Sequence, residues 1–212
     1  MRLLSLAFDL PLMPRDLAGF RASVARAAGY DTDVFHNHQT DGKLQYRYPM
    51  VQYRSEGGQA AILGLNEGAD AIYNWYSAAG NHLIWNDAEH DLRIKRLDVR
   101  EFEIQYHETM PRPYRLRHWL ALNQNRYREW QALPGLQARA EKLDGQLAAN
   151  ILTFCRAVNW RLPQRLEVSI QEIAATRPTR FLGVDMVSFE VVFTSNLALP
   201  FGIGLGKAVS HG

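Results

Sequence analysis

The segment RLLSLAFDLPLMPRDLAGFRASVARAAG, residues 2–29, sets the pattern from which the fold of this chain is predicted. Its first part, Arg2–Leu10, is a compact apolar run bounded by prolines, which is typical of a β-strand. Pro14 suits the first turn of a helix. Apolar residues then recur at intervals of three and four until Gly29, which can end a helix. The chain is therefore expected to open with a strand followed by a helix.

The rest of the chain continues with strands and helices in a mixed order. Alternating or compact apolar runs predict strands, and apolar residues at helical spacing predict helices. Strands are expected at 34–38, 45–53, 60–65, 92–106, 115–122, 165–170 and 187–193, and helices at 66–76, 123–133 and 136–154. A phase shift in the 92–106 strand predicts a bulge near Arg100–Glu101.

Because helices and strands do not alternate strictly, we predict an α+β fold with antiparallel sheets. Two ferredoxin-like domains fit the order of the elements. We place them at residues 1–88 and 89–212, and a boundary at 107–115 also fits the pattern.

The composition is that of an ordinary folded protein. The 212 residues are 47% hydrophobic and 22% charged, and the net charge of +2 favours a nucleic-acid partner only slightly. The single cysteine, Cys155, excludes an intrachain disulfide, which fits a reducing cytoplasm, and its apolar neighbours favour a buried structural thiol. The apolar N-terminus is interrupted by Asp9 and two prolines, which favours a strand over a signal peptide. No run approaches the roughly 20 apolar residues that a membrane span requires.

Alternating glycines near the C-terminus form a candidate anion-binding loop. Gly202, Gly204 and Gly206 are followed by Lys207 and Ser210. Backbone N–H groups at glycines can approach an anion closely, and the lysine and serine add a charge and a donor. The spacing fits neither the P-loop nor the dinucleotide-binding fingerprint. A flexible tail with no role is the alternative interpretation.

Two histidines in the segment FHNH, residues 35–38, form a candidate acid–base pair. His36 and His38 are two residues apart and would point to the same face of a strand. A metal pair would need further ligands, and the other histidines do not show metal-like spacing. Imidazole accepts or donates a proton at neutral pH, so acid–base chemistry is the better-supported function. The alternative is a pair of hairpin histidines with no task.

The segment KLQYRYPMVQYR, residues 43–54, interleaves aromatic and basic side chains. Aromatic rings can stack on unpaired bases and arginines can bind phosphate, although a sheet face with arginines lying along it fits equally well. Further basic residues on neighbouring predicted strands would extend a positive surface or belong to ordinary solvated faces: Arg93, Lys95, Arg96, Arg112, Arg115 and Arg117.

Together these motifs resemble one branch of the CRISPR repeat-processing endoribonucleases of the glycine-rich-loop (RAMP) superfamily. The resemblance rests on FHNH (35–38), YRYPMVQYR (46–54), AILGLNEG (61–68) and LPFGIGLGKAVSHG (199–212), in this order. It covers about half of the chain, and residues 80–180 carry no matching motif. In the family the last motif usually continues into a further strand, whereas this sequence stops at Gly212.

The resemblance implies two ferredoxin-like domains and cleavage of precursor CRISPR RNA inside each repeat, without a metal or other cofactor. The ribose 2′-OH attacks the scissile phosphate and leaves a 2′,3′-cyclic phosphate and a 5′-OH. His36 and His38 would serve as base and acid, in an order that the sequence leaves open, and Tyr46 is the third candidate catalytic residue. The candidate RNA-binding residues are Arg21, Lys43, Arg47, Arg54, Gly202, Gly204, Gly206, Lys207 and Ser210.

CRISPR repeat RNA is the expected partner, in the cytoplasm and without membrane association. Other CRISPR effector subunits and a second copy of the chain are further candidates. A non-catalytic repeat-binding subunit is the alternative function, and it would not need the pair His36 and His38. A metal-dependent enzyme with these histidines as ligands is a third interpretation, which a chelator would distinguish.

Overall fold

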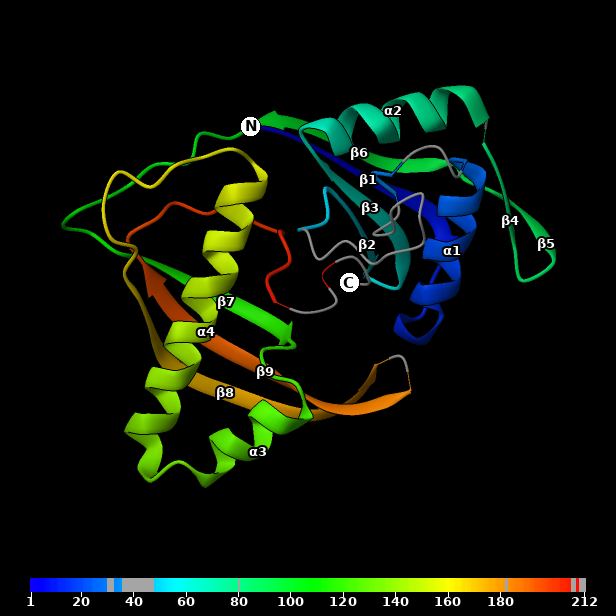
Figure 1. Cartoon of the computed structure of the whole chain (residues 1–212). Coiled ribbons are helices and arrows are strands. Elements are labelled where there is room, and N and C mark those ends of the chain that lie inside the picture. Colours follow the sequence, from blue (N-terminus) through cyan, green and yellow to red (C-terminus); the bar gives the residue numbers. More distant parts are fainter. Residues whose placement is uncertain (30–32, 36–47, 80, 182, 207–208, 210–212) are drawn as a thin grey trace. The chain divides into compact units, whose positions relative to one another are not determined.

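A computed structural model of the chain describes residues 1–29, 33–35, 48–79, 81–181, 183–206 and 209. The chain divides into two compact units. Unit 1 comprises Met1–Glu103 and Val209–Gly212, and unit 2 comprises Ile104–Ala208. Both units combine helices with antiparallel sheets, so the predicted α+β class is confirmed (Figure 1).

Unit 1 has the strand and helix order of a ferredoxin-like domain with one inserted hairpin. Its elements are β1 (Arg2–Pro11), η1 (Pro14–Asp16), α1 (Leu17–Ala27), β2 (Val51–Glu56), β3 (Gln59–Leu65), α2 (Glu67–Ala79), β4 (His82–Trp85), β5 (Ala88–Asp91) and β6 (Ile94–Glu101). The sheet order is β2-β3-β1-β6, and β4 and β5 form a separate hairpin. Without that hairpin the order is β-α-β-β-α-β, which defines the ferredoxin-like unit.

The core of unit 1 lies between its sheet and its two helices. Leu6 and Phe8 of β1 alternate along the strand, so both point to the helix side, where Phe20 of α1 and Ile72 of α2 are also buried. Tyr53 of β2 packs its ring edge-on against Phe20, with ring centroids 6.1 Å apart. Burying a large apolar side chain contributes roughly 1.5–3 kcal/mol, so this layer dominates the stability of the unit.

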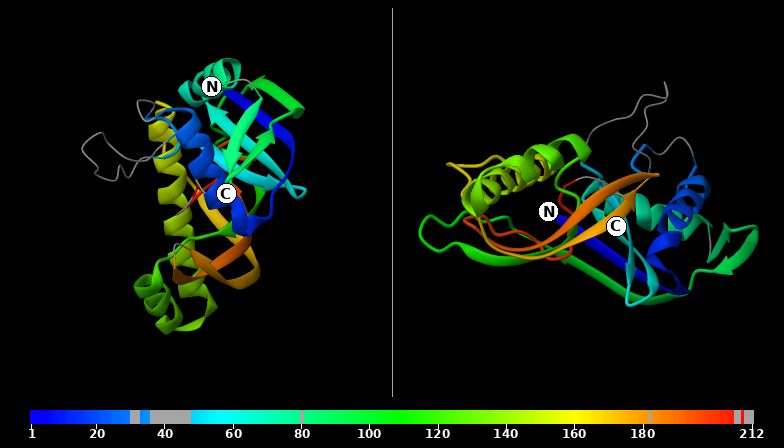
Figure 2. Two further views of the ribbon diagram at one scale, coloured as in Figure 1. Left: turned by 90° about the vertical axis from the view of Figure 1, so that its right-hand side faces the viewer. Right: turned by 90° about the horizontal axis from the view of Figure 1, so that it is seen from below.

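Unit 2 repeats the strand–helix–strand–strand part of this pattern. Its elements are β7 (Arg112–Trp119), α3 (Gln124–Ala132), α4 (Gly135–Ala157), β8 (Val168–Phe181) and β9 (Val184–Ser195), and its sheet order is β7-β9-β8. The two views in Figure 2 show α4 lying along one face of the sheet. Asn123 caps α3, because its side-chain oxygen accepts the Arg126 N–H at 2.9 Å.

The core of unit 2 comes from one stripe of α4 and one face of β9. Leu147, Ile151 and Phe154 of α4 are fully buried, as are Phe189 and Val191 of β9. Because side chains alternate along a strand, this register directs the intervening residues of β9 to the face opposite α4. One of these residues is the charged Glu190.

Some elements differ from the sequence-based expectations. The strand predicted at 92–106 ends at Glu101, and its irregularity lies at the other end, between the pairs Ala7–Arg96 and Phe8–Ile94, instead of near Arg100. The division into units lies after β6, beyond the residue 88 chosen from sequence, because β6 pairs with β1 and so belongs to unit 1.

Other differences concern turns and strand lengths. Residues 33–35 form a turn where an extended segment was predicted, and β2 begins only at Val51. The hairpin of β4 and β5 was not predicted, since only Leu83 and Trp85 of it are buried. Asn66 begins α2 through its carbonyl oxygen, which accepts the Ala69 N–H, while its side chain accepts the Arg2 N–H. Within the described part of the chain, no helix combines the length and apolar character needed to cross a membrane.

Candidate functional site

All three predicted catalytic residues and four of the predicted RNA-binding residues lie outside the part of the chain that the structure describes. They are His36, His38, Tyr46, Lys43, Arg47, Lys207 and Ser210. The residues on either side of the 36–47 segment are described, and both sides are held firmly in unit 1.

Phe35 anchors the N-terminal side of this segment. Its side chain is only 3% exposed, and its ring meets Trp75 of α2 edge-on, with 6.1 Å between the ring centroids. The aromatic residue that opens the FHNH motif is therefore part of the core. Sequence reasoning assigned it no role, although an aromatic residue next to two polar histidines is a signal of a buried anchor.

Met50 anchors the C-terminal side through its backbone. Its carbonyl oxygen accepts the Leu65 N–H at 2.9 Å. A Cβ at Gly68, in the first turn of α2, would come within 2.1 Å of the same oxygen. Only a glycine therefore lets α2 approach Met50 this closely, which explains the second glycine of the motif AILGLNEG.

Tyr48 is a second anchor on this side, and a buried amide holds it. Gln52 of β2 is 1% exposed, and its Nε2 donates to the Tyr48 hydroxyl at 3.0 Å and to the Pro49 carbonyl at 3.3 Å. The Gln52 Oε1 accepts from Nη2 of Arg54 at 3.1 Å. A buried amide with partners at both ends fixes the local geometry, because each end holds a neighbouring group in a defined position.

Arg54 continues this row of polar side chains along β2. Its guanidinium, 18% exposed, makes an ion pair with Glu56 at 3.5 Å, and Glu56 also accepts from Arg96 of β6. Burial lowers the pKa of the Arg54 guanidinium, an effect that Glu56 opposes. Ala7 and Ala61 lie in register between Arg54 and Arg96 on β1 and β3, and their small side chains leave room for the two arginines to share one carboxylate.

Arg21 lies on α1 at the border of the core. Burial lowers the pKa of its guanidinium, while the neighbouring Tyr53 phenol raises it. Tyr53 is completely buried, which raises the pKa of its phenol, and its hydroxyl has no hydrogen-bond partner among the described residues. The structure therefore places Arg21 beside Tyr53 of the sheet, with part of its side chain withdrawn from solvent.

The described part of the glycine-rich loop packs against unit 2. Gly202 and Gly206 have φ angles of +82° and +102°, which favour glycine. A Cβ at Gly206 would lie 2.7 Å from the ring of Trp119, which is itself 1% exposed. The positive φ and the close approach to Trp119 both require glycine at position 206, so this part of the loop packs in a defined position against Trp119.

A cluster of arginines around Glu190 was missed as a site by sequence reasoning. Glu190 of β9 accepts from Nε of Arg115 at 2.8 Å, and Arg117 lies 3.5 Å from the same carboxylate oxygen. Hydrogen bonding from Arg115 and the charges of Arg115, Arg117 and Arg177 lower the pKa of Glu190. The two β7 arginines stood out in the sequence. Their convergence with Arg177 depends on strand register, which the sequence does not display.

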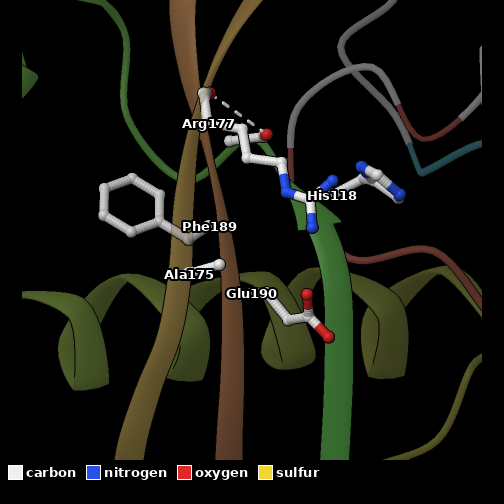
Figure 3. A pocket seen from close by; sticks show the side chains of 6 residues that line it. His118, Ala175, Arg177, Phe189 and Glu190 are labelled. Atoms are coloured by element: carbon white, nitrogen blue, oxygen red, sulfur yellow. Dashed lines mark hydrogen bonds between the residues drawn. The ribbon is translucent and has the colours of Figure 1, made fainter.

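The depression next to this cluster is lined by His118, Ala175, Arg177, Ser188, Phe189 and Glu190 (Figure 3). The Arg177 side chain extends across β9 toward His118, and the Glu190 carboxylate points toward β7.

Neither a described metal centre nor a reactive thiol accompanies these features. Across the described ranges, no three His, Cys, Asp or Glu side chains are grouped closely enough to hold a metal ion. Cys155 is buried, and burial raises the pKa of its thiol to about 11, as expected of a structural cysteine.

Two family models match this chain, one over each unit. A model of the Cas6b N-terminal domain matches residues 1–103, and a model of the Cas6b C-terminal domain matches residues 105–212. A crystal structure of Cas6b superimposes with a TM-score of 0.80 at 22% identity, covering 100% of this chain and 96% of that chain.

Two other solved structures share the fold. A CRISPR RNA processing endoribonuclease Cas6b has a TM-score of 0.69 at 19% identity, again covering 100% of this chain and 96% of that one. Csf5, a type IV CRISPR-Cas Cas6 crRNA endonuclease, has a TM-score of 0.58 at 14% identity with the same coverage. At these identities the structural likeness establishes the fold. A search among curated proteins returned no matching sequence.

Proposed function

The chain belongs to the Cas6b family, and from this premise we propose that it is an endoribonuclease that cuts CRISPR precursor RNA within its repeats. Membership confirms, at the level of the family, the resemblance that the sequence motifs indicated. The function is proposed for the whole chain, because the two family models together match nearly all of it.

The proposed reaction is attack of a ribose 2′-OH on the adjacent phosphodiester, without a metal ion. One histidine of the pair His36 and His38 removes the 2′-OH proton, and the other protonates the leaving 5′-oxygen. Tyr46 donates a hydrogen bond to the charge that develops on the phosphate. The products are a 2′,3′-cyclic phosphate and a 5′-OH.

The observation that carries this proposal is the anchoring of the segment on both sides. Phe35 directly precedes the histidine pair, Tyr48 follows Tyr46 by two residues, and both anchors are buried in unit 1. Catalytic groups act efficiently when rigid elements position them. The motif residues thus include the anchors as well as the groups assigned to the chemistry.

The RNA is bound by basic and glycine residues in both units. In unit 1 these are Arg21, Lys43, Arg47 and Arg54. The guanidinium of Arg54 has N–H donors beyond those directed at Gln52 and Glu56. In the C-terminal loop, Gly202, Gly204, Gly206, Lys207 and Ser210 hold the RNA backbone and take no part in the chemistry.

The decisive experiment is a cleavage assay on a labelled repeat RNA from the source genome, in EDTA. A matched RNA carries deoxyribose at the cut site. We expect a single cut of the first RNA and none of the second. Binding without a cut would instead indicate a repeat-binding subunit. Cleavage that disappears in EDTA would indicate a metal-dependent reaction and overturn the proposed mechanism.

A further inference from the structure

The face of the unit 2 sheet opposite α4 gathers charge at one row of the register. Side chains that alternate with the buried Phe189 and Val191 point to this face. Glu190 lies between them on β9, and its partner on β8 is Ala175. The row therefore combines one carboxylate with a small neighbour.

A β-bulge in β7 brings two residues to this row in place of one. Leu116 pairs with Val191 and Trp119 pairs with Phe189, so Arg117 and His118 together oppose Glu190. His118 has a φ of +52°, the left-handed conformation that such an extra residue can require. Bulges re-aim side chains, and this one directs Arg117 to within 3.5 Å of the Glu190 carboxylate while His118 lines the depression.

Glu190 makes close contacts with one arginine, Arg115, and two further arginines lie near it. Its side chain is 17% exposed and holds Arg115 by two contacts of 2.8 and 2.7 Å to one oxygen. Arg117 is 67% exposed at 3.5 Å from the same oxygen, and Arg177 is the third cation acting on this carboxylate. Within this cluster, three guanidinium groups surround one carboxylate, so the four side chains carry a net charge of +2.

Small side chains keep the centre of the cluster open. Ala175 and Ser188 line the depression together with the larger Arg177, His118 and Glu190. The Ser188 hydroxyl donates to the Arg177 carbonyl oxygen at 3.3 Å, which ties β9 to β8 at this point. Planar guanidinium forks with free approach from one side suit the oxygens of a phosphodiester.

We propose that Arg117, Arg177 and His118 form a phosphate-binding site on the unit 2 sheet that holds the RNA backbone, with Glu190 fixing Arg115 as its wall. The inference rests on the proposed function, because it takes RNA as the source of the phosphodiester. It adds contacts beyond the glycine-rich loop and the unit 1 arginines. The site contributes affinity and positioning, and it takes no part in proton transfer.

The test measures binding of the full chain to a labelled repeat RNA with deoxyribose at the cut site, over 50–300 mM salt. Each phosphate contact to single-stranded nucleic acid contributes about 0.7 to the slope of log K against log salt. We expect Arg117→Ala and Arg177→Ala each to reduce the slope by about 0.7, and the double variant by about 1.4. Arg177→Lys keeps the charge and should retain the slope.

The matched control is Arg128→Ala on α3, an exposed arginine of the helix layer. It removes the same charge and should leave the slope unchanged. Wild-type slopes for Arg117→Ala and Arg177→Ala would overturn the site and favour an acidic protein partner for this face. An equal loss of slope in Arg128→Ala and Arg177→Ala would also overturn it, because the effect would then come from overall charge. If the wild-type chain fails to bind the RNA at all, the proposed function fails with it. Wild-type binding with unaffected variants refutes this site alone.

Discussion

The sheets of both units carry a glutamate paired with two arginines beside small side chains, but the two clusters differ in how they are arranged. In unit 1, Glu56 offers one oxygen to Arg54 and the other to Arg96, and the small Ala7 and Ala61 let these side chains meet across the sheet. In unit 2, one oxygen of Glu190 receives both Arg115 and Arg117, and the small side chains beside it leave an open depression.

The arginines of the two clusters differ in their exposure to solvent. The Arg54 side chain is 18% exposed, whereas Arg115 and Arg117 are 54% and 67% exposed. A buried arginine with partners stiffens the structure around it, and an exposed excess of arginines remains available to a polyanion. The buried Arg54–Glu56 pair thus stiffens the sheet of unit 1, whereas the arginines around Glu190 in unit 2 remain exposed.

The largest expected effect concerns the chemistry assigned to unit 1. His38→Ala should slow cleavage by roughly 10²–10⁴-fold, the usual contribution of one acid–base group. RNA affinity should stay within a few-fold, because the change removes no phosphate contact. Single-turnover cleavage and binding of the deoxy-substituted RNA measure the two quantities. His82→Ala in the hairpin of β4 and β5 is the control. Near-normal cleavage by His38→Ala would remove the histidine from the mechanism.

The next effect tests whether the buried amide of unit 1 is the positioning element. Gln52→Ala leaves the Tyr48 hydroxyl and Arg54 without their shared partner, and we expect a loss of about 1–3 kcal/mol in the free energy of unfolding. Cleavage should slow more than RNA binding weakens, because Tyr48 lies two residues from Tyr46. Urea unfolding and single-turnover assays provide the readouts. The exposed Gln171→Ala in unit 2 should change stability by less than about 0.5 kcal/mol. Equal effects of the two substitutions would contradict the comparison.

A glycine pair in unit 2 tests how firmly the glycine-rich loop is seated. Gly206→Ala combines a left-handed φ of +102° with a Cβ placed 2.7 Å from Trp119, so we expect destabilisation of about 1–3 kcal/mol and weaker RNA binding. Gly145→Ala within α4 meets no described atom within 4 Å and should stabilise the chain by about 0.5–1 kcal/mol. Thermal unfolding distinguishes the two. A Gly206→Ala variant as stable as wild type would mean that the seat is not required.

A smaller effect is expected from the end of the same loop. Lys207→Ala should reduce the salt slope of RNA binding by about 0.7, the contribution of one phosphate contact. The cleavage rate of bound RNA should not change. Affinity measured across salt concentrations tests this expectation, and an unchanged slope would remove the loop from the RNA-binding surface.

The smallest effect is the pH dependence of the Glu190 cluster. The neighbouring arginines hold the pKa of Glu190 below its ordinary value of 4.5. A carboxyl group whose pKa is lowered by folding stabilises the folded state at pH values above its ordinary pKa. This contribution is lost as the pH falls through the folded-state pKa. The melting temperature of wild type should therefore exceed that of Glu190→Gln at pH 7, with the difference shrinking below about pH 4. A constant difference between pH 7 and pH 3 would show that charge is not its cause.

Much of the fold could be predicted from local pattern, whereas the arrangement of the arginines could not. The apolar spacing of α4 and the alternation of β9 are visible in the sequence because one element generates each pattern. The meeting of Arg117 and His118 opposite Glu190 depends on a bulge in the pairing of two strands about 70 residues apart.

Gln52 shows a second limit of sequence reasoning. The aromatic and basic segment around it fitted an RNA-facing strand and an ordinary sheet face equally well, and the structure buries Gln52 as the hydrogen-bond partner of Tyr48. Polar residues give little sign of burial in a sequence, because their burial depends on partners supplied elsewhere in the fold.

The pairing of β1 with β6 also bears on how the chain is synthesised. Arg2 pairs with Glu101, so β1 can pair with β6 only after about 100 further residues have been synthesised. In contrast, β8 and β9 follow each other closely in the sequence, and Phe181 pairs with Val184. At roughly 5–20 residues per second, translation leaves one edge of the apolar β1 uncovered for ~5–20 s. Long-range pairing of this kind forms slowly and exposes intermediates to aggregation. Substitutions that weaken β6 should therefore lower the yield of native protein in cells more than equally destabilising ones in the hairpin of β8 and β9.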